Sequence, residues 1–116
     1  MRIATAILIL FFGLIPSVSA HVYMLQCSPE PGSTVEKSPD RISITFVGSV
    51  EPAFSKIEVF NEKGEKVSGK TLFKEDDTIM EVELKKNLPP GKYTVKWKCM
   101  SLDGHMQKKE FIFFIK

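Results

Sequence analysis

The sequence has few of the residues that most often carry chemistry. Its 116 residues include two cysteines, two histidines and one tryptophan. Neither sign of charge dominates, because 16 lysines and arginines stand against 14 aspartates and glutamates. This balance argues against a nucleic-acid or anionic-membrane partner held by bulk electrostatics. The sequence presents no catalytic nucleophile beside a base and no paired general acid and base, so we do not expect an enzyme.

There is one long apolar run, and it lies at the start of the chain. Met1 and Arg2 precede the uncharged stretch IATAILILFFGLIP, which small residues follow. This order is typical of a signal peptide, and the run is shorter than the about 20 residues that span a membrane. We expect residues 1–20 to be removed on export by cleavage after Ala20, with cleavage after Ser19 as the alternative.

Residues 21–116 are then the mature protein, and they are enough for one domain. They contain no repeat, no low-complexity tract and no linker. No second apolar run follows the leader, so we expect the exported domain to be soluble, periplasmic and monomeric.

Alternation of apolar and polar residues dominates the mature chain and is typical of half-buried strands. The clearest runs are RISITFV, KIEVF, IMEVEL and KYTVKWKC. Turn-forming stretches separate the runs, namely SPEPGS, KSPD, NEKGE and NLPPG. About seven short strands in a domain of this size predict an all-β fold, either an antiparallel sandwich or a small barrel. We expect Trp97 to be an anchor of its core.

The two cysteines fall in the exported part, where oxidising conditions permit a disulfide. Cys27 shares strand parity with Leu25, and Cys99 shares it with Trp97. Both thiols therefore point inward if Leu25 and Trp97 do. Parity does not measure the distance between the two residues, so a Cys27–Cys99 disulfide and two buried free thiols both stay open.

Both histidines occupy positions suited to metal binding. His21 becomes the N-terminal residue if cleavage follows Ala20, and its free amine and imidazole Nδ1 can then chelate one ion. In general the amine titrates near about 8 and histidine near about 6.5, so both can release their protons near neutral pH. His105 lies in the loop SLDGHM, two residues after Asp103. Together these residues offer three nitrogens and one carboxylate.

This donor set selects among metals. Nitrogen and oxygen donors in tetragonal geometry suit Cu(II), whereas structural zinc takes four cysteine or histidine ligands, and calcium and magnesium take oxygen ligands. We therefore expect one Cu(II) per chain, bound by His21, Asp103 and His105. Taken singly, each histidine could be a solvated bystander and Asp-Gly an ordinary turn. The metal hypothesis explains both histidines together.

Three segments, HVYMLQCSPEPGS, FVGSVEPAFSKIEV and above all LPPGKYTVKWKCMSLDGH, resemble the CopC family of exported copper-binding proteins. The resemblance extends over essentially the whole mature chain, residues 21–116. It implies an immunoglobulin-like Greek-key β-sandwich that binds Cu(II) through an N-terminal histidine, an aspartate and a histidine. Carried over by position, these ligands are His21, Asp103 and His105.

The sequence departs from the family pattern in two respects. Many members carry an acidic residue near the copper where this chain has Gly48, so its role is lost or moved to Glu51. Some members also carry a methionine-rich loop for Cu(I), whereas Met24, Met100 and Met106 are spread singly. We expect these methionines to serve packing or surface roles, although a weak thioether contact to copper stays open.

The preferred function is a carrier that buffers or delivers Cu(II) in copper homeostasis or resistance. The resemblance implies a separate membrane copper transporter of the CopD type as partner. One alternative is a copper-dependent oxidative enzyme with a histidine brace, which this short chain with its single tryptophan is poorly equipped to be. The other is an interaction module without a metal.

Overall fold

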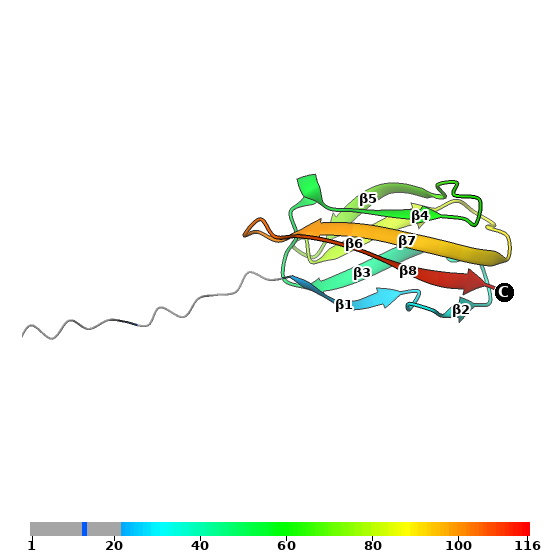
Figure 1. The fold of residues 1–116 in the computed structure, drawn as a ribbon, viewed down its shortest axis with the longest axis horizontal. Coiled ribbons are helices and arrows are strands. Elements are labelled where there is room, and N and C mark those ends of the chain that lie inside the picture. The colour runs from blue at the N-terminus through cyan, green and yellow to red at the C-terminus, as the bar shows by residue number, and fades with distance from the viewer. Residues whose placement is uncertain (1–12, 14–21) are drawn as a thin grey trace, which may run out of the picture.

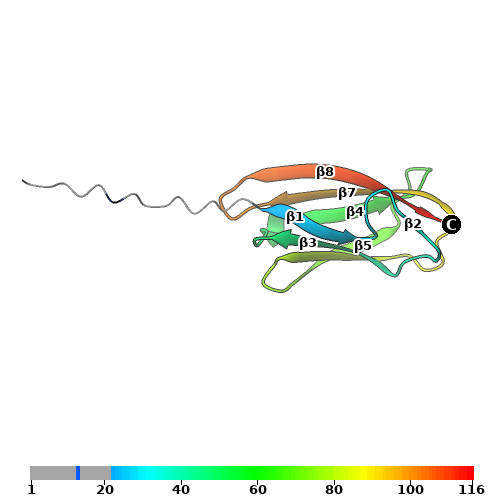
Figure 2. The ribbon, with the colours of Figure 1, turned by 90° about the horizontal axis from the view of Figure 1, so that it is seen from below.

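Eight strands form two four-stranded sheets in the computed structural model, which describes Gly13 and residues 22–116. One sheet has the order β1-β3-β6-β5 and the other β2-β8-β7-β4, and the two pack as a sandwich (Figures 1 and 2). The strands are β1 Tyr23–Ser28, β2 Thr34–Val35, β3 Arg41–Val47, β4 Lys56–Phe60, β5 Ser68–Lys74, β6 Ile79–Leu84, β7 Gly91–Met100 and β8 Met106–Ile115, and a 3-10 turn, η1, covers Pro52–Phe54. No helix of this described part is long and apolar enough to cross a membrane.

The predicted all-β sandwich is confirmed, with two details that alternation did not predict. β2 has only two residues and pairs with β8 in parallel, so the fold is not purely antiparallel. β5 was not predicted by alternation because its segment, SGKTLFK, mixes small, polar and charged residues and keeps no buried face.

The core lies between the sheets and is built from the inward side of each strand. Trp97 is 4% exposed, as predicted, and its ring meets the edge of Phe46 at a centroid distance of 5.4 Å. Tyr93 on β7 and Phe113 on β8 stand opposite each other, and their rings stack at a centroid distance of 5.4 Å. β7 and β8 pair without interruption over their full length. Because this pairing has no bulge, alternate residues of β7 keep facing the core.

Leu25 does not point inward, so the parity that linked it to Cys27 does not hold. The ladder between β1 and β3 shifts register between Met24 and Gln26, so an extra residue is inserted at this point. Leu25 is consequently 62% exposed, whereas Cys27 is buried. Strict parity fails across such a bulge because the inserted residue reverses which face the following side chains take.

Of the two outcomes left open for the cysteines, the structure has buried free thiols rather than a disulfide. Cys27 lies on β1, an edge strand of one sheet, and Cys99 lies on β7, a central strand of the other. Parity placed both inside but says nothing of their position across the sheets. Burial raises the pKa of both thiols, with the Glu30 carboxylate adding to the effect at Cys27.

We expect neither thiol of the folded protein to react within minutes with an aromatic disulfide reagent at neutral pH. Only the thiolate attacks, and the raised pKa keeps its fraction low. Both thiols should react at once in denaturant. If no thiol appears on unfolding, and the mass is lower by about 2 Da, the oxidised protein carries the bridge instead.

Candidate metal centre

The hairpin between β7 and β8 presents two of the three predicted ligands at one end of the sandwich (Figure 1). Its ends are joined by a bond from the Ser101 amide to the His105 carbonyl oxygen, at 2.9 Å. The Gly104 amide donates to the Ser101 carbonyl oxygen, also at 2.9 Å. Gly104 has φ +86°, a left-handed conformation that glycine adopts without steric cost. The turn therefore holds Asp103 and His105 at the exposed tip.

Ser101 organises this hairpin from beneath. Its side chain is fully buried, and its hydroxyl donates to Oδ1 of Asp103. The same hydroxyl oxygen accepts the His105 amide at 3.1 Å, and that amide lies 3.3 Å from Asp103 Oδ1. These bonds orient one carboxylate oxygen of Asp103 toward the turn. Sequence analysis missed the role of Ser101, whose signal was a hydroxyl at the inward parity of β7, one residue past its end.

The first described residue of the mature domain lies against the same end. Val22 is 2% exposed, and its carbonyl oxygen accepts a hydrogen bond from Nε2 of Gln107. Gln107 is two residues beyond His105, at the start of β8. In both views the beginning of β1 and the β7–β8 hairpin lie at the same end of the molecule (Figures 1 and 2). The chain is thus fixed beside the hairpin one residue after His21.

His21 itself lies outside the described residues, as does the predicted leader apart from Gly13. Within the part that the structure describes, no three histidine, cysteine, aspartate or glutamate residues gather as a metal site. The described residues therefore include two of the three predicted ligands, Asp103 and His105, and Val22, the residue that follows the third.

The glycine that replaces an acidic residue of the family pattern has a backbone reason. Gly48 adopts φ +97°, where a residue with a Cβ would be strained. The loop continues to Glu51, whose amide donates to the Met100 carbonyl oxygen at 2.8 Å. Glu51 therefore sits alongside the last residue of β7, next to the hairpin.

The three methionines do not form one cluster at the hairpin. Met24 packs against the core from β1. Met100 and Met106 stand opposite each other at the base of the hairpin, both half-buried. Two of the three are therefore neighbours in space, which their separation in the sequence did not indicate.

Replacing Ser101 with alanine should loosen the hairpin. The change leaves the His105 amide with one weak acceptor and removes the buried hydroxyl that donates to the charged Asp103, so we expect a loss of about 1–3 kcal/mol in unfolding free energy. Urea unfolding measures it, and Ser49→Ala, whose exposed hydroxyl bonds the Asp76 carbonyl oxygen at 2.8 Å, is the control and should cost less than about 1 kcal/mol. Equal losses would contradict a special role for Ser101.

Comparison with known proteins gives a consistent result. Residues 24–116 match the CopC domain. Copper transport protein CutJ of Bacillus subtilis is 41% identical over 102 residues, which cover 85% of this chain and 19% of CutJ. The chain thus spans about a fifth of the length of that relative. Protein YobA of Escherichia coli K12 is 34% identical over 105 residues, covering 87% of this chain and 83% of YobA.

Solved structures share the same fold. CopC from Methylosinus trichosporium OB3b has a TM-score of 0.75 at 28% identity, covering 83% of this chain and 94% of that one. PcoC from Escherichia coli, described as a methionine-rich copper resistance protein, has a TM-score of 0.71 at 25% identity, covering 83% and 99%. The domain match over residues 24–116 and the sandwich shared with a solved CopC structure lead to one conclusion: this chain belongs to the CopC family.

Proposed function

We propose that this protein binds one Cu(II) ion outside the cytoplasm and buffers or delivers it in copper homeostasis or resistance. The ligands are the amine and imidazole of His21, the carboxylate of Asp103 and the imidazole of His105. Copper enters as cargo. The names of the relatives, a copper transport protein and a copper resistance protein, support this choice of metal.

The observation that carries the proposal is the meeting of two chain segments at one end of the sandwich. Val22 is tied to Gln107 by its carbonyl oxygen, and Gln107 lies two residues from His105. Consecutive Cα atoms are about 3.8 Å apart, so residue 21 starts within one residue of this anchor. This short distance along the chain supports the proposal that the His21 amine reaches the hairpin that presents Asp103 and His105.

The donor set fits Cu(II). An N-terminal amine, two imidazoles and one carboxylate are the mixture of nitrogen and oxygen that Cu(II) favours over the harder cations. The bond from Ser101 orients the Asp103 carboxylate at the turn, as a supporting hydrogen bond to a metal ligand does. Exposure of the turn suits a carrier that must take up and release its ion.

Export completes the site in this scheme. The amine of His21 exists only after the bond between Ala20 and His21 is cut, so the precursor lacks one donor. The proposal therefore includes a cleaved leader, residues 1–20, and a periplasmic location. A separate membrane transporter of the CopD type is the partner we propose for the delivery role.

Titration of the mature protein with Cu(II) against a competing chelator tests the function. Asp103→Asn and His105→Ala should each weaken binding by about 100-fold or more, because each removes a direct ligand. Asp40→Asn, on an exposed turn remote from the hairpin, is the matched control and should bind as the wild type does. Copper affinity no greater than that of an unrelated exported domain would overturn the proposal.

A further inference from the structure

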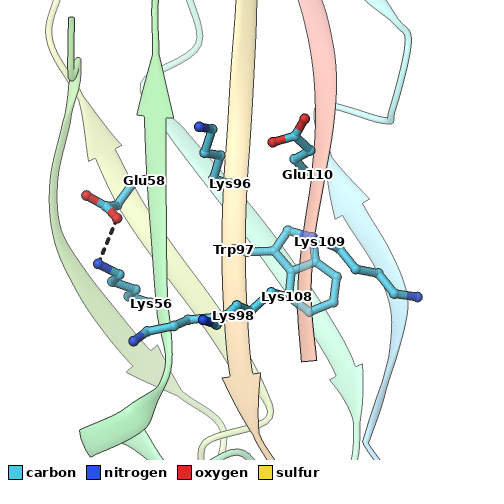
Figure 3. A pocket seen from close by; sticks show the side chains of 8 residues that line it. All are labelled: Lys56, Glu58, Lys96, Trp97, Lys98, Lys108, Lys109 and Glu110. Atoms are coloured by element: carbon cyan, nitrogen blue, oxygen red, sulfur yellow. Dashed lines mark ion pairs between the residues drawn. The ribbon is translucent and has the colours of Figure 1, made fainter. Parts of the chain in front are cut away.

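Three lysines form a row across the outer face of the β4-β7-β8 sheet. Lys56 stands directly opposite Lys98, and Lys98 stands directly opposite Lys108. Their sequence neighbours Ile57, Trp97 and Cys99 are buried, so the lysines point away from the core. Figure 3 shows the three side chains gathered together, whereas Lys109 points away from them. We call Lys56, Lys98 and Lys108 the lysine row.

The stability of the sheet does not explain this row. Like charges directly opposite each other across strands are destabilising, and adjacent strands are only about 4.8 Å apart. The next row along the same face shows the favoured arrangement, because Glu58, Lys96 and Glu110 alternate in sign across the same three strands. The two rows therefore differ in their charge pattern although they cross the same three strands.

The lysine row is largely uncompensated. Lys56 forms an ion pair with Glu58, Nζ to Oε1 at 2.8 Å, and this pair helps to lower the pKa of that carboxyl. Within residues 22–116, no ion pair joins Lys98 or Lys108 to an acidic side chain. Lysines on edge strands can serve to prevent aggregation, but Lys98 is on β7, which is paired on both sides.

We propose that the lysine row is a docking surface for an acidic segment of a partner protein. Carboxylates laid across the three strands would neutralise the repulsion that the isolated domain leaves in place. The row borders a surface hollow of about 490 Å³, which offers room for side chains of such a segment.

The shape of the charge pattern favours a narrow acidic chain over an anionic bilayer. The row is one residue wide, and the carboxylates of Glu58 and Glu110 follow it on the same face. A flat anionic surface would meet those carboxylates as well as the lysines, and the carboxylates would oppose its binding. A single peptide laid along the row contacts the three lysines directly and meets Glu58 and Glu110 only at its side.

The lysine row lies close to the hairpin that carries Asp103 and His105. Lys98 and Lys108 are each two residues from the pair Met100 and Met106, which forms the base of the hairpin. At about 3.3 Å per residue, a docked segment lies roughly 7 Å from that base. It would therefore hold a partner beside Asp103 and His105, and its charge would speed the encounter.

Fluorescence anisotropy of a labelled hexaglutamate peptide tests the docking on the metal-free protein, so the result does not depend on copper binding. At about 20 mM salt, replacing all three lysines of the row with glutamine should weaken binding by about tenfold or more. The control replaces Lys63, Lys85 and Lys86, exposed lysines on other turns, with the same loss of charge, and should change affinity less than about twofold.

Three outcomes of the binding measurements would overturn the proposal. The wild type fails to bind the peptide, the control variant loses as much affinity as the row variant, or phosphatidylglycerol vesicles bind through the row while the peptide does not. Thermal unfolding separates docking from a structural role. Lys98→Gln should raise the unfolding temperature by about 1–4 °C, because it relieves the repulsion. A fall of several degrees would make the row structural and overturn the proposal.

Discussion

A single residue added in front of His21 is expected to weaken Cu(II) binding by about 100-fold or more. The amine and the imidazole of one residue chelate without the entropy of joining two separate groups, and an extension turns that amine into an amide that no longer donates. A mature protein beginning at His21 should be compared with one that retains Ala20, by titration against a competing chelator. The two proteins correspond to cleavage after Ala20 and after Ser19.

The extended protein should be folded as the wild type is. Val22 keeps its bond to Gln107, because that bond uses the carbonyl oxygen and not the amine of the preceding residue. Thermal unfolding without copper should therefore agree between the two proteins. If the extended form binds copper as tightly as the mature form, the N-terminal amine is not a ligand.

Replacing Trp97 with alanine is expected to cost about 3–5 kcal/mol of unfolding free energy, the range for a large aromatic residue removed from a core. Trp97 is 4% exposed, and its ring has an edge contact with Phe46. The variant loses this contact and leaves a cavity that the two sheets close only in part. Domains of this kind have about 5–15 kcal/mol in total, so the variant should unfold at far lower urea.

Phe54→Ala is the matched control for that change. Its ring is 53% exposed on η1, so the loss should stay within about 0.5 kcal/mol. Urea unfolding followed by circular dichroism measures both variants. A cost below about 1.5 kcal/mol at Trp97 would mean that the core tolerates the cavity and that this residue is no anchor.

The candidate site was predicted as residues but not as an arrangement. Asp103 and His105 stood out in the sequence because the chain has few histidines and a turn between two strands. Ser101 did not stand out, since its role depends on being buried beneath the turn with its hydroxyl toward Asp103. The link between Val22 and Gln107 spans most of the chain, and no local pattern predicts such a contact.

The fold shows the same division. Runs with strict alternation were placed correctly as β3, β4, β6 and β7, because burial of one face imposes period two on the residues themselves. β5 lacked this signature. The bulge in β1 puts Leu25 and Cys27 on different faces although their parity is the same. Parity could not show this, because an inserted residue is a property of the pairing of two strands and not of one strand.

By itself, the sequence determined the fold class, the inward faces of the regular strands and two exposed ligand candidates, because these follow from local periodicity and turn chemistry. Only the tertiary structure decided which strands are neighbours and in what register. The register places Lys98 directly opposite Lys56 and Lys108, and Met100 opposite Met106. The packing of the chain brings Val22 beside Gln107. Register arises from the packing of whole sheets and from long-range hydrogen bonds, which no short stretch of sequence contains.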